Sequence, residues 1–245
     1  MSPLIAAVFV SFLSLFPLNL SAAEGQTAAI EKVLERVLHN RKPDAIVAAP
    51  VKGLYEVRYG AEIVYVTQDG RFLLQGDLFD LQSISNLTEA KRSVVRKEII
   101  AAIDPATMII FKPQKTRYVV DVFTDVDCPY CRKMHKKIDR YLHEGIEVRY
   151  LAYPRSGVNT PSYFKAVAVW CSPDRQAAMT LAKSGGKLEP KSCSNPVLDH
   201  MAKAGAIGIS GTPTLVLPDG SVIAGYIPAD QLRRILDERI GQHQG

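Results

Sequence analysis

The residues best suited to chemistry in this chain are two cysteines, Cys128 and Cys131, separated by two residues. A β-rich apolar segment, residues 118–124, precedes them, and residues 131–142 have helical periodicity. A cysteine at a helix N-terminus lies beside unpaired backbone N–H groups and the positive end of the helix dipole, which favour the thiolate. Such positions lower a cysteine pKa from about 8.5 to roughly 3.5–7.5. The spacing therefore predicts a redox dithiol in which Cys128 attacks a disulfide and Cys131 resolves the mixed disulfide.

Two other interpretations of the cysteines are disfavoured. An inert bridge between Cys128 and Cys131 would close so short a loop that it would constrain the unfolded chain little. A zinc site would need a second closely spaced pair, and the remaining cysteines, Cys171 and Cys193, are far apart in the sequence. We therefore expect neither a metal nor a cofactor.

The residues around the two cysteines should tune them. Pro129 fixes φ near −65° at the helix start and removes one N–H group. Tyr130 places an aromatic side chain beside the attacking sulfur and is a candidate for substrate binding. Positive charge follows at five positions, of which the last four are simplest to interpret as a solvated helix face: Arg132, Lys133, His135, Lys136 and Lys137.

The elements around the dithiol follow the order of a thioredoxin fold. A strand at 146–152 follows the helix, and three helices then begin at pairs of an N-cap residue and a proline. A β-hairpin and a last helix close the chain. The helix-opening pairs are Thr160-Pro161, Ser172-Pro173 and Asn195-Pro196, and the closing elements are strands 214–217 and 221–224 and helix 228–240.

A second motif, Thr212-Pro213, comes directly before the hairpin. In a thioredoxin fold the proline at this place is cis and packs across from the active cysteine. The backbone of the residue before it can then pair with an extended substrate segment, as an edge strand does. We therefore expect Thr212 and Pro213 to bind substrate, and an ordinary turn proline is the alternative.

The chain divides into a signal segment (1–23), a small α+β domain (24–85), a linker helix (86–104) and the thioredoxin-like domain (105–245), with a helical insertion at about 155–206. Apolar periodicity predicts a helix at 26–40 and strands at 54–59, 62–67 and 71–75 in the small domain. That domain contains no cysteine. It should serve assembly or binding rather than catalysis.

Residues 1–23 carry no charged side chain, and small residues end the segment at Ser21, Ala22 and Ala23. This pattern is typical of a secretory signal cleaved after Ala23. No Lys or Arg precedes the apolar run, so an uncleaved anchor helix is the alternative. Export to an oxidising compartment would favour paired cysteines.

The composition of the 245 residues is typical of a globular protein, with 47% hydrophobic and 22% charged residues. The formal net charge is only +5. No stripe of Lys and Arg interleaved with aromatic residues is present, which argues against a nucleic-acid partner.

Longer segments resemble the periplasmic DsbC/DsbG disulfide isomerases. In the thioredoxin-like part these are VFTDVDCPYC, VRYLAYPRSG and GISGTPTLVLPDGSVIAGYIP, and in the small domain PVKGLYEV and VYVTQDGRFLLQGDLFDL. The resemblance covers nearly all of the chain after the signal segment and is closer to DsbC.

The resemblance implies a cystatin-like dimerisation domain, a homodimer whose two thioredoxin domains face one cleft, and misoxidised exported proteins as substrates. It implies that a membrane reductase of the DsbD type keeps Cys128 and Cys131 reduced. By the same resemblance, Cys171 and Cys193 form a structural disulfide.

Two features depart from the family pattern. The pair between the cysteines is Pro-Tyr, as in the DsbG branch, which leaves a holdase chaperone or a sulfenic-acid reductase as the alternative function. The buried acid of thioredoxin has no match, because Val122 occupies its position and Asp121 should face the other side of the strand.

Overall fold

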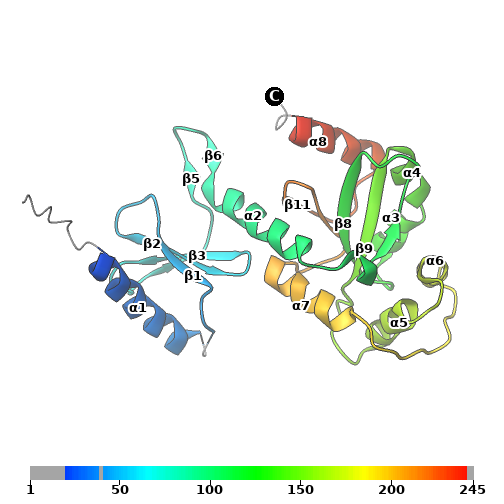
Figure 1. Ribbon diagram of the computed structural model, residues 1–245, viewed down its shortest axis with the longest axis horizontal. Helices are drawn as coiled ribbons and strands as arrows, with labels where there is room; N and C mark the ends of the chain where they lie inside the picture. The colour runs from blue at the N-terminus through cyan, green and yellow to red at the C-terminus, as the bar shows by residue number, and fades with distance from the viewer. Residues whose placement is uncertain (1–19, 39–40, 242–245) are drawn as a thin grey trace, which may run out of the picture.

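The computed structural model describes residues 20–38 and 41–241, which form two folded units joined by a helix (Figure 1). Most of the predicted signal segment, residues 1–19, lies outside the described residues, as do residues 39–40 at the end of the predicted first helix. Helix α1 (Leu20–Val37) begins earlier than predicted and includes the expected cleavage position. Among the described helices, none is long and apolar enough to cross a membrane.

In the N-terminal unit, α1 packs on an antiparallel sheet of strand order β1-β2-β3-β4. The apolar stripe of α1 buries Ile30 and Leu34 against Val57 and Val64 of the sheet. The strands are β1 (Ala45–Ala48), β2 (Leu54–Tyr59), β3 (Glu62–Thr67) and β4 (Leu73–Leu74). The predictions for β2 and β3 are confirmed, whereas β4 is shorter than the predicted strand 71–75 and β1 was not predicted.

Helix α2 (Leu87–Ala101) connects the two units and follows a short hairpin of β5 (Phe79–Asp80) and β6 (Ser85–Asn86) (Figure 1). It begins at Asn86, whose side chain accepts a hydrogen bond from the Glu89 N–H group. After α2, Asp104 caps a 3-10 turn, η1 (Pro105–Thr107), so the helix ends before the proline as predicted.

The linker helix is a packed element rather than a free connection. Figure 1 shows α2 beside α7 (Val197–Ile207), and the two helices are in contact. The N-terminal unit also meets α7, because the Ala61 N–H group donates to the Ala206 carbonyl over 2.7 Å. A Cβ atom at Gly60 would lie 2.4 Å from that carbonyl oxygen, so glycine permits this approach.

The C-terminal unit is built on a mixed sheet of strand order β11-β10-β8-β9-β7. Strands β8 and β9 are parallel neighbours, and the remaining pairs are antiparallel. The strands are β7 (Ile109–Phe111), β8 (Tyr118–Thr124), β9 (Ile146–Ala152), β10 (Thr214–Val216) and β11 (Val222–Ala224). The predicted bounds of β8 and β9 are confirmed, and the short edge strand β7 was not predicted.

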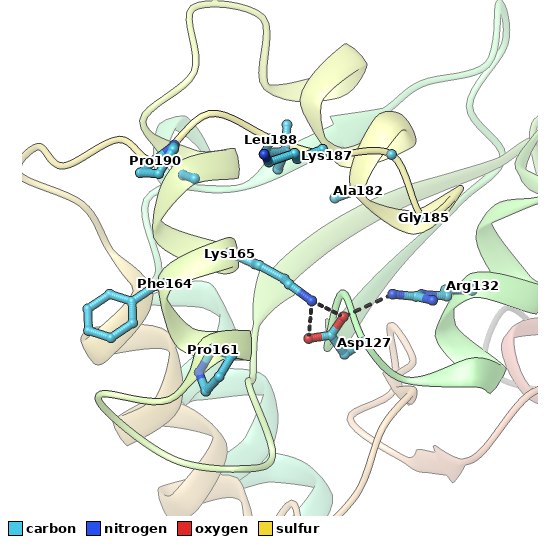
Figure 2. A pocket seen from close by; sticks show the side chains of 12 residues that line it. Asp127, Arg132, Pro161, Phe164, Lys165, Ala182, Gly185, Lys187, Leu188 and Pro190 are labelled. Atoms are coloured by element: carbon cyan, nitrogen blue, oxygen red, sulfur yellow. Dashed lines mark hydrogen bonds and ion pairs between the residues drawn. The ribbon is translucent and has the colours of Figure 1, made fainter.

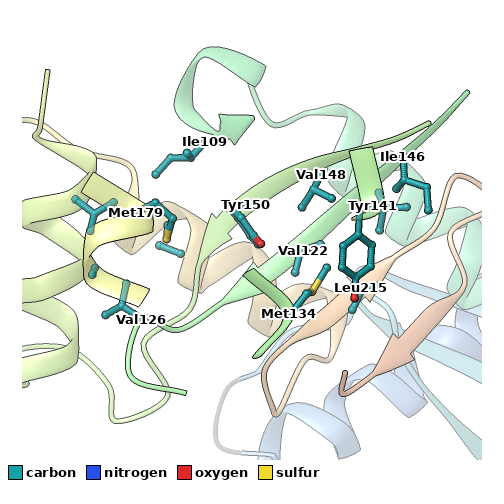
Figure 3. Packing of buried hydrophobic residues seen from close by; sticks show 14 of the residues in the cluster. Ile109, Val122, Val126, Met134, Tyr141, Ile146, Val148, Tyr150, Met179 and Leu215 are labelled. Atoms are coloured by element: carbon teal, nitrogen blue, oxygen red, sulfur yellow. The ribbon is translucent and has the colours of Figure 1, made fainter. Parts of the chain in front are cut away.

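Successive residues of β8 contribute to two different cores, because strand side chains alternate between faces. Val120 and Val122 join the larger cluster, which Figure 3 shows around Tyr150, Met134 and Tyr141. Phe123 joins the smaller cluster on the other face, with side chains from α7. The larger cluster takes side chains from α3 (Pro129–His135), α4 (Ile138–His143), α5 (Pro161–Trp170), α6 (Arg175–Lys183) and α8 (Ala229–Gly241).

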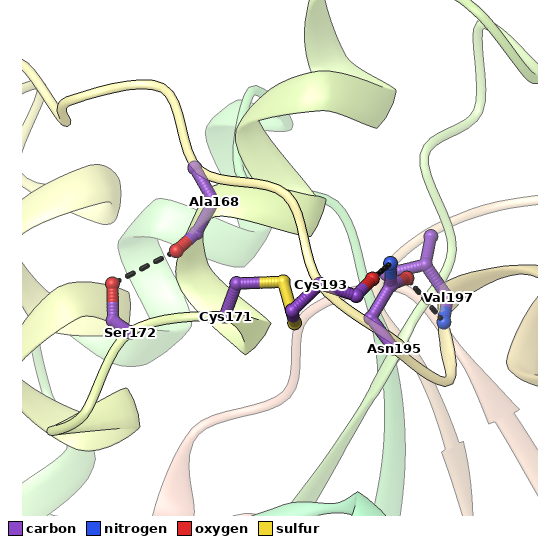
Figure 4. Close-up of a disulfide and its surroundings, with 6 residues drawn as sticks. All are labelled: Ala168, Cys171, Ser172, Cys193, Asn195 and Val197. Carbon is purple, nitrogen blue, oxygen red and sulfur yellow. Dashed lines mark hydrogen bonds between the residues drawn. A yellow bond between two sulfur atoms is a disulfide. The ribbon is translucent and has the colours of Figure 1, made fainter.

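The helical insertion consists of α5, α6 and α7, and a disulfide between Cys171 and Cys193 ties the end of α5 to the segment before α7 (Figure 4). The predicted cap of α5 is confirmed, since the Thr160 hydroxyl accepts from the Tyr163 N–H group. The other two predicted caps are wrong by one to two residues. Helix α6 is capped by Asp174, and Pro196 is the N-cap of α7.

The predicted single helix 131–142 is also wrong, because two helices, α3 and α4, replace it. Lys137 has φ −113° and ψ 22°, outside the helical region, and its N–H group bonds three residues back to the Met134 carbonyl. Met134 of α3 and Tyr141 of α4 both lie in the larger core cluster, as they would on one face of a continuous helix.

Candidate active site

Cys128 is the N-cap residue of α3, and Pro129 occupies the first helical position. The Cys128 carbonyl accepts the first helical hydrogen bond, from the Arg132 N–H group over 3.0 Å. Proline is favoured at this position because its missing N–H would have had no helical partner and its φ suits the helix. The local sequence therefore places the Cys128 sulfur at the positive end of the helix, as predicted.

The turn before Cys128 is held by Asp125, a buried carboxylate that the sequence alone did not single out. It accepts hydrogen bonds from the Asp127 N–H group, the Ser162 hydroxyl and Arg155. Burial raises the pKa of Asp125, but these hydrogen bonds lower it more, so the pKa lies below its ordinary value. The ionised side chain fixes the chain direction between β8 and α3.

The two cysteine thiols are free and buried, and their pKa values shift in opposite directions. Burial raises the pKa of Cys128, but the Thr212 hydroxyl and the polar groups of Cys131 and Tyr130 lower it more, so the net shift is downward. Burial dominates at Cys131 and raises its pKa, although Lys183, Asp125 and Thr124 oppose that effect. The site therefore favours a thiolate at Cys128 and a thiol at Cys131.

Pro213 lies opposite the attacking sulfur. The Thr212–Pro213 peptide bond is cis, as predicted, and the Thr212 carbonyl accepts a hydrogen bond from the Cys128 thiol over 3.2 Å. The Thr212 Oγ1 atom is buried and has no hydrogen-bond partner among the described residues. An unpaired hydroxyl beside a sulfur can donate to it once the thiolate forms.

A cavity of about 210 Å³ lies on one side of α3, and Figure 2 shows its charged floor. Asp127 accepts hydrogen bonds there from Arg132 over 2.9 Å and from Lys165 over 2.8 and 3.0 Å. Phe164 and Leu188 supply apolar walls. The Tyr130 side chain, between the two cysteines, is 60% exposed to solvent.

The basic residues after the dithiol do not share one environment. Lys133, Lys136 and Lys137 are exposed, which confirms a solvated face for these three. His135 does not belong to that face. It is buried, its Nδ1 atom lies 3.2 Å from the Tyr150 hydroxyl and its Nε2 atom 3.0 Å from the Thr180 hydroxyl. Burial lowers the pKa of His135 to about 4, so it is neutral at physiological pH.

Lys183 is another functional candidate, and its position in the sequence alone does not mark it as one. It ends α6 and is 4% exposed, one helical turn after the buried Met179. A lysine on the apolar side of an amphipathic helix is the signal that could have identified it. Asp121 behaves as predicted: it lies in β8 between Val120 and Val122, which join the core on the dithiol side of the sheet, so its side chain faces the opposite side.

The chain resembles proteins of one family along nearly its whole length. A family model described as the disulfide bond isomerase protein N-terminal domain matches residues 21–89, and one described as a thioredoxin-like domain matches residues 105–240. Thiol:disulfide interchange protein DsbC of Escherichia coli K12 is 32% identical over 216 residues, covering 88% of this chain and 89% of the relative. The chain belongs to the DsbC family of thiol:disulfide isomerases.

Other DsbC proteins extend this match. The relative from Dickeya dadantii is 34% identical over 229 residues, covering 93% of this chain and 94% of the relative. Among solved structures, a disulfide interchange protein from Neisseria gonorrhoeae has a TM-score of 0.50 and 29% identity, and the match covers 56% of this chain and 97% of that one. The DsbC-type N-terminal domain and the thioredoxin-like domain agree with the predicted fold.

Proposed function

We propose that this DsbC-type protein reshuffles incorrect disulfides in exported proteins, with Cys128 as the nucleophile and Cys131 as the resolving thiol. The opposite pKa shifts of the two thiols at the start of α3 are the observation that carries this assignment. The Cys128 thiolate attacks one sulfur of a substrate disulfide, a mixed disulfide forms, and the other substrate sulfur leaves as a thiolate.

Two outcomes follow from the mixed disulfide. In isomerisation, a substrate thiolate, either the one first released or one formed by exchange with another substrate disulfide, attacks the substrate sulfur of the mixed disulfide. A new substrate disulfide forms, and Cys128 leaves as a thiolate without net oxidation. In the escape reaction, Cys131 attacks the Cys128 sulfur, so the substrate is reduced and a Cys128–Cys131 disulfide forms. A membrane reductase of the DsbD type would then supply two electrons to restore the dithiol.

Substrate would lie across the loop that contains Thr212 and Pro213. The Thr212 carbonyl is 3.2 Å from the Cys128 sulfur, so a chain paired with this backbone would place its disulfide next to the nucleophile. The exposed ring of Tyr130, two residues after Cys128, could offer substrate an apolar contact. Pro129 contributes by fixing the helix start on which the Cys128 pKa depends.

The N-terminal domain fits a role in dimerisation. Strand β4 is an edge of its sheet and pairs only with β3 within the described chain. Phe72, Leu73 and Leu74 are about half exposed along this edge. An unpaired edge strand with apolar side chains is a template for a second chain. We propose that residues 24–85 join two copies through the β4 edge near Gly76, after export to the periplasm and signal cleavage near Ala23.

Refolding of a scrambled multi-disulfide protein tests the proposed activity. The wild-type chain should restore native disulfides, and Cys128→Ser should restore none above background. The Pro-Tyr pair between the cysteines favours a second candidate, a holdase chaperone or sulfenic-acid reductase. If the protein is a holdase, the Cys128→Ser variant should still suppress aggregation of the unfolded substrate. If it is a sulfenic-acid reductase, the wild-type protein should reduce a sulfenylated substrate but should not reshuffle the scrambled one.

Gly76→Arg tests the role of dimerisation. No heavy atom lies within 4 Å of a Cβ placed at Gly76, although its φ of 159° is one that L residues rarely adopt. A charged side chain there should block the contact, and circular dichroism of the variant checks that the monomer is folded. Sedimentation should show a monomer that still reduces disulfides and isomerises them several-fold more slowly, because one domain cannot hold a substrate during repeated attack. The matched control is Val47→Arg on the opposite edge strand, β1, which should remain a dimer. A monomer with full isomerase activity would contradict the proposal.

A further inference from the structure

Lys183 occupies an unusual position for a lysine, because its ammonium group lies inside the protein beneath the dithiol. Lysine is almost never fully buried unless it is paired. The Nζ atom lies 2.8 Å from the Thr124 hydroxyl oxygen and 3.4 Å from the Asp125 carbonyl oxygen. Both partners belong to the end of β8 and the turn that leads into Cys128, so Lys183 reaches from the helical insertion to the active site.

Carboxylate pairing does not account for this buried charge. Within the described part of the chain, no ion pair links Lys183 to an acidic side chain, and the nearby Asp125 carboxylate is engaged by Arg155 and Ser162. The Tyr150 ring centroid lies 5.5 Å from Nζ. The titratable or charged groups that face Lys183 are Cys128, Cys131, Arg132 and His135 near or in α3, Asp125 in the turn, and Tyr150 in β9.

Of these groups, the two cysteines are the ones whose charge changes during thiol–disulfide exchange. Burial lowers the pKa of Lys183 to about 8, while negative charge at Cys131, Asp125 or Cys128 raises it. Lys183 in turn lowers the pKa of Cys131, against the larger effect of burial, and the Thr124 hydroxyl acts in the same direction. Lys183 and Cys131 therefore each favour the charged form of the other.

We propose that Lys183 accepts the proton of the Cys131 thiol, through the Thr124 hydroxyl, when Cys131 resolves a mixed disulfide on Cys128. With a pKa of about 8, Lys183 has a neutral fraction near pH 7, and in that form its amine takes a proton from the Thr124 hydroxyl, which takes one from the Cys131 thiol. The Cys131 thiolate then attacks the Cys128 sulfur, the new disulfide forms, and the substrate leaves as a thiolate. This inference rests on the proposed roles of Cys128 and Cys131 and adds a positioning residue to them.

Two further features agree with this role. Lys183 and His135 line a cavity of about 660 Å³ beside α3, through which the accepted proton can pass to solvent. His135 has its pKa lowered to about 4 and therefore stays neutral at the pH where Lys183 titrates. The position of the thioredoxin acid is filled by Val122, so the lysine supplies a proton acceptor that the sheet itself lacks.

Release of thionitrobenzoate from a mixed disulfide on Cys128 measures the resolving step directly. The rate should be followed from pH 6 to 9.5 in the full-length protein and in the variants Lys183→Met, Thr124→Val and Cys131→Ser. We expect Lys183→Met to slow release at least tenfold at pH 7 and to move the midpoint of the pH profile upward by about one unit. Thr124→Val should shift it in the same direction. Lys191→Met, an exposed lysine of the same insertion, is the matched control and should follow the wild type.

The variants separate failure of the inference from failure of the proposed function. If Cys131→Ser released the probe at the wild-type rate, the resolving role of Cys131 would be wrong. If Cys131→Ser blocked release while Lys183→Met kept the wild-type rate and profile, the role of Lys183 alone would be overturned.

A measurement on the wild-type protein does not depend on how a variant folds. The NMR titration of the Lys183 side chain should give a lower pKa in the oxidised protein, where no thiolate can form, than in the reduced one. Equal values in both states would contradict the proposal.

Discussion

The two cysteine pairs of this molecule lie in the same domain, but the first cysteine of one pair begins a helix and the first cysteine of the other ends one. Cys128 is the N-cap residue of α3, whereas Cys171 is the C-cap residue of α5. The positive end of a helix stabilises a thiolate and the negative end destabilises it. Cys128 and Cys131 are free and buried, while Cys171 and Cys193 are joined although they are 22 residues apart in sequence. Position on the helix, rather than cysteine content, separates the reactive pair from the structural one.

The surroundings of the two pairs differ in the same way. Groups that stabilise a thiolate surround the reactive pair, including Lys183 and the Thr212 hydroxyl, which lower the pKa values of the two thiols. Around Cys193 the interactions are local, such as the Asn195 side-chain amide that donates to the Cys193 carbonyl over 2.8 Å (Figure 4). The bridge ties the end of α5 to the segment before α7, and these two helices are in contact with each other. We therefore expect changes at one pair to alter chemistry and changes at the other to alter stability.

The largest effect should come from the reactive pair. Cys128→Ser should reduce isomerase activity to background, because no other described thiol has both a lowered pKa and a place beside Pro213. Cys131→Ser should accumulate mixed disulfides, because the escape reaction loses its nucleophile. Non-reducing electrophoresis and mass spectrometry would detect the adducts. The assigned roles would be reversed if Cys131 were alkylated faster than Cys128 and Cys131→Ser formed no adducts.

A smaller effect, of a different kind, is expected at the structural pair. Replacing Cys171 and Cys193 together with Ala should lower the free energy of unfolding by about 3 kcal/mol in the chain-entropy model. For a domain of this size that corresponds to roughly 6–12 °C in melting temperature. The rate at which Cys128 is alkylated should stay near the wild-type value. A loss of alkylation rate in step with the loss of stability would show that the two pairs are not independent.

The reactive pair and the sheet beneath it could be predicted from sequence because their signals are local. Strands β8 and β9 are rich in β-branched and aromatic residues, which favour strands, and the cysteine spacing predicts Cys128 at a helix start. The break between α3 and α4 carries no proline or glycine, so it depends on packing that only the folded sheet provides. The burial of His135 and Lys183 likewise could not be predicted from the local sequence. Their burial depends on Tyr150, Thr180 and Thr124, which are distant in the chain.

The last prediction concerns Asp121, the acidic residue on the face of the sheet opposite the dithiol. The Asp121 side chain is buried, and its Oδ1 atom has no hydrogen-bond partner among the described residues. Burial raises the pKa of Asp121 to about 6, and Arg149 opposes this effect only in part. A carboxyl group with a raised pKa in the folded state binds its proton more tightly there than in the unfolded chain. Its contribution to stability is therefore lost as pH rises from about 4 to 6.

Asp121→Asn removes the cost of this buried charge. The variant should gain about 1 kcal/mol of stability at pH 7, since a shift of one pKa unit corresponds to about 1.4 kcal/mol and the new amide keeps part of the burial cost. At pH 4, where Asp121 is already protonated in the folded state, the two proteins should differ little. Chemical denaturation at both pH values measures these differences. The pH profile of the Cys131 reaction should not change, because Lys183 and Thr124 act on that thiol from the other face. A shifted profile would mean that Asp121 reaches the dithiol through the sheet, and the comparison between the two faces would then fail.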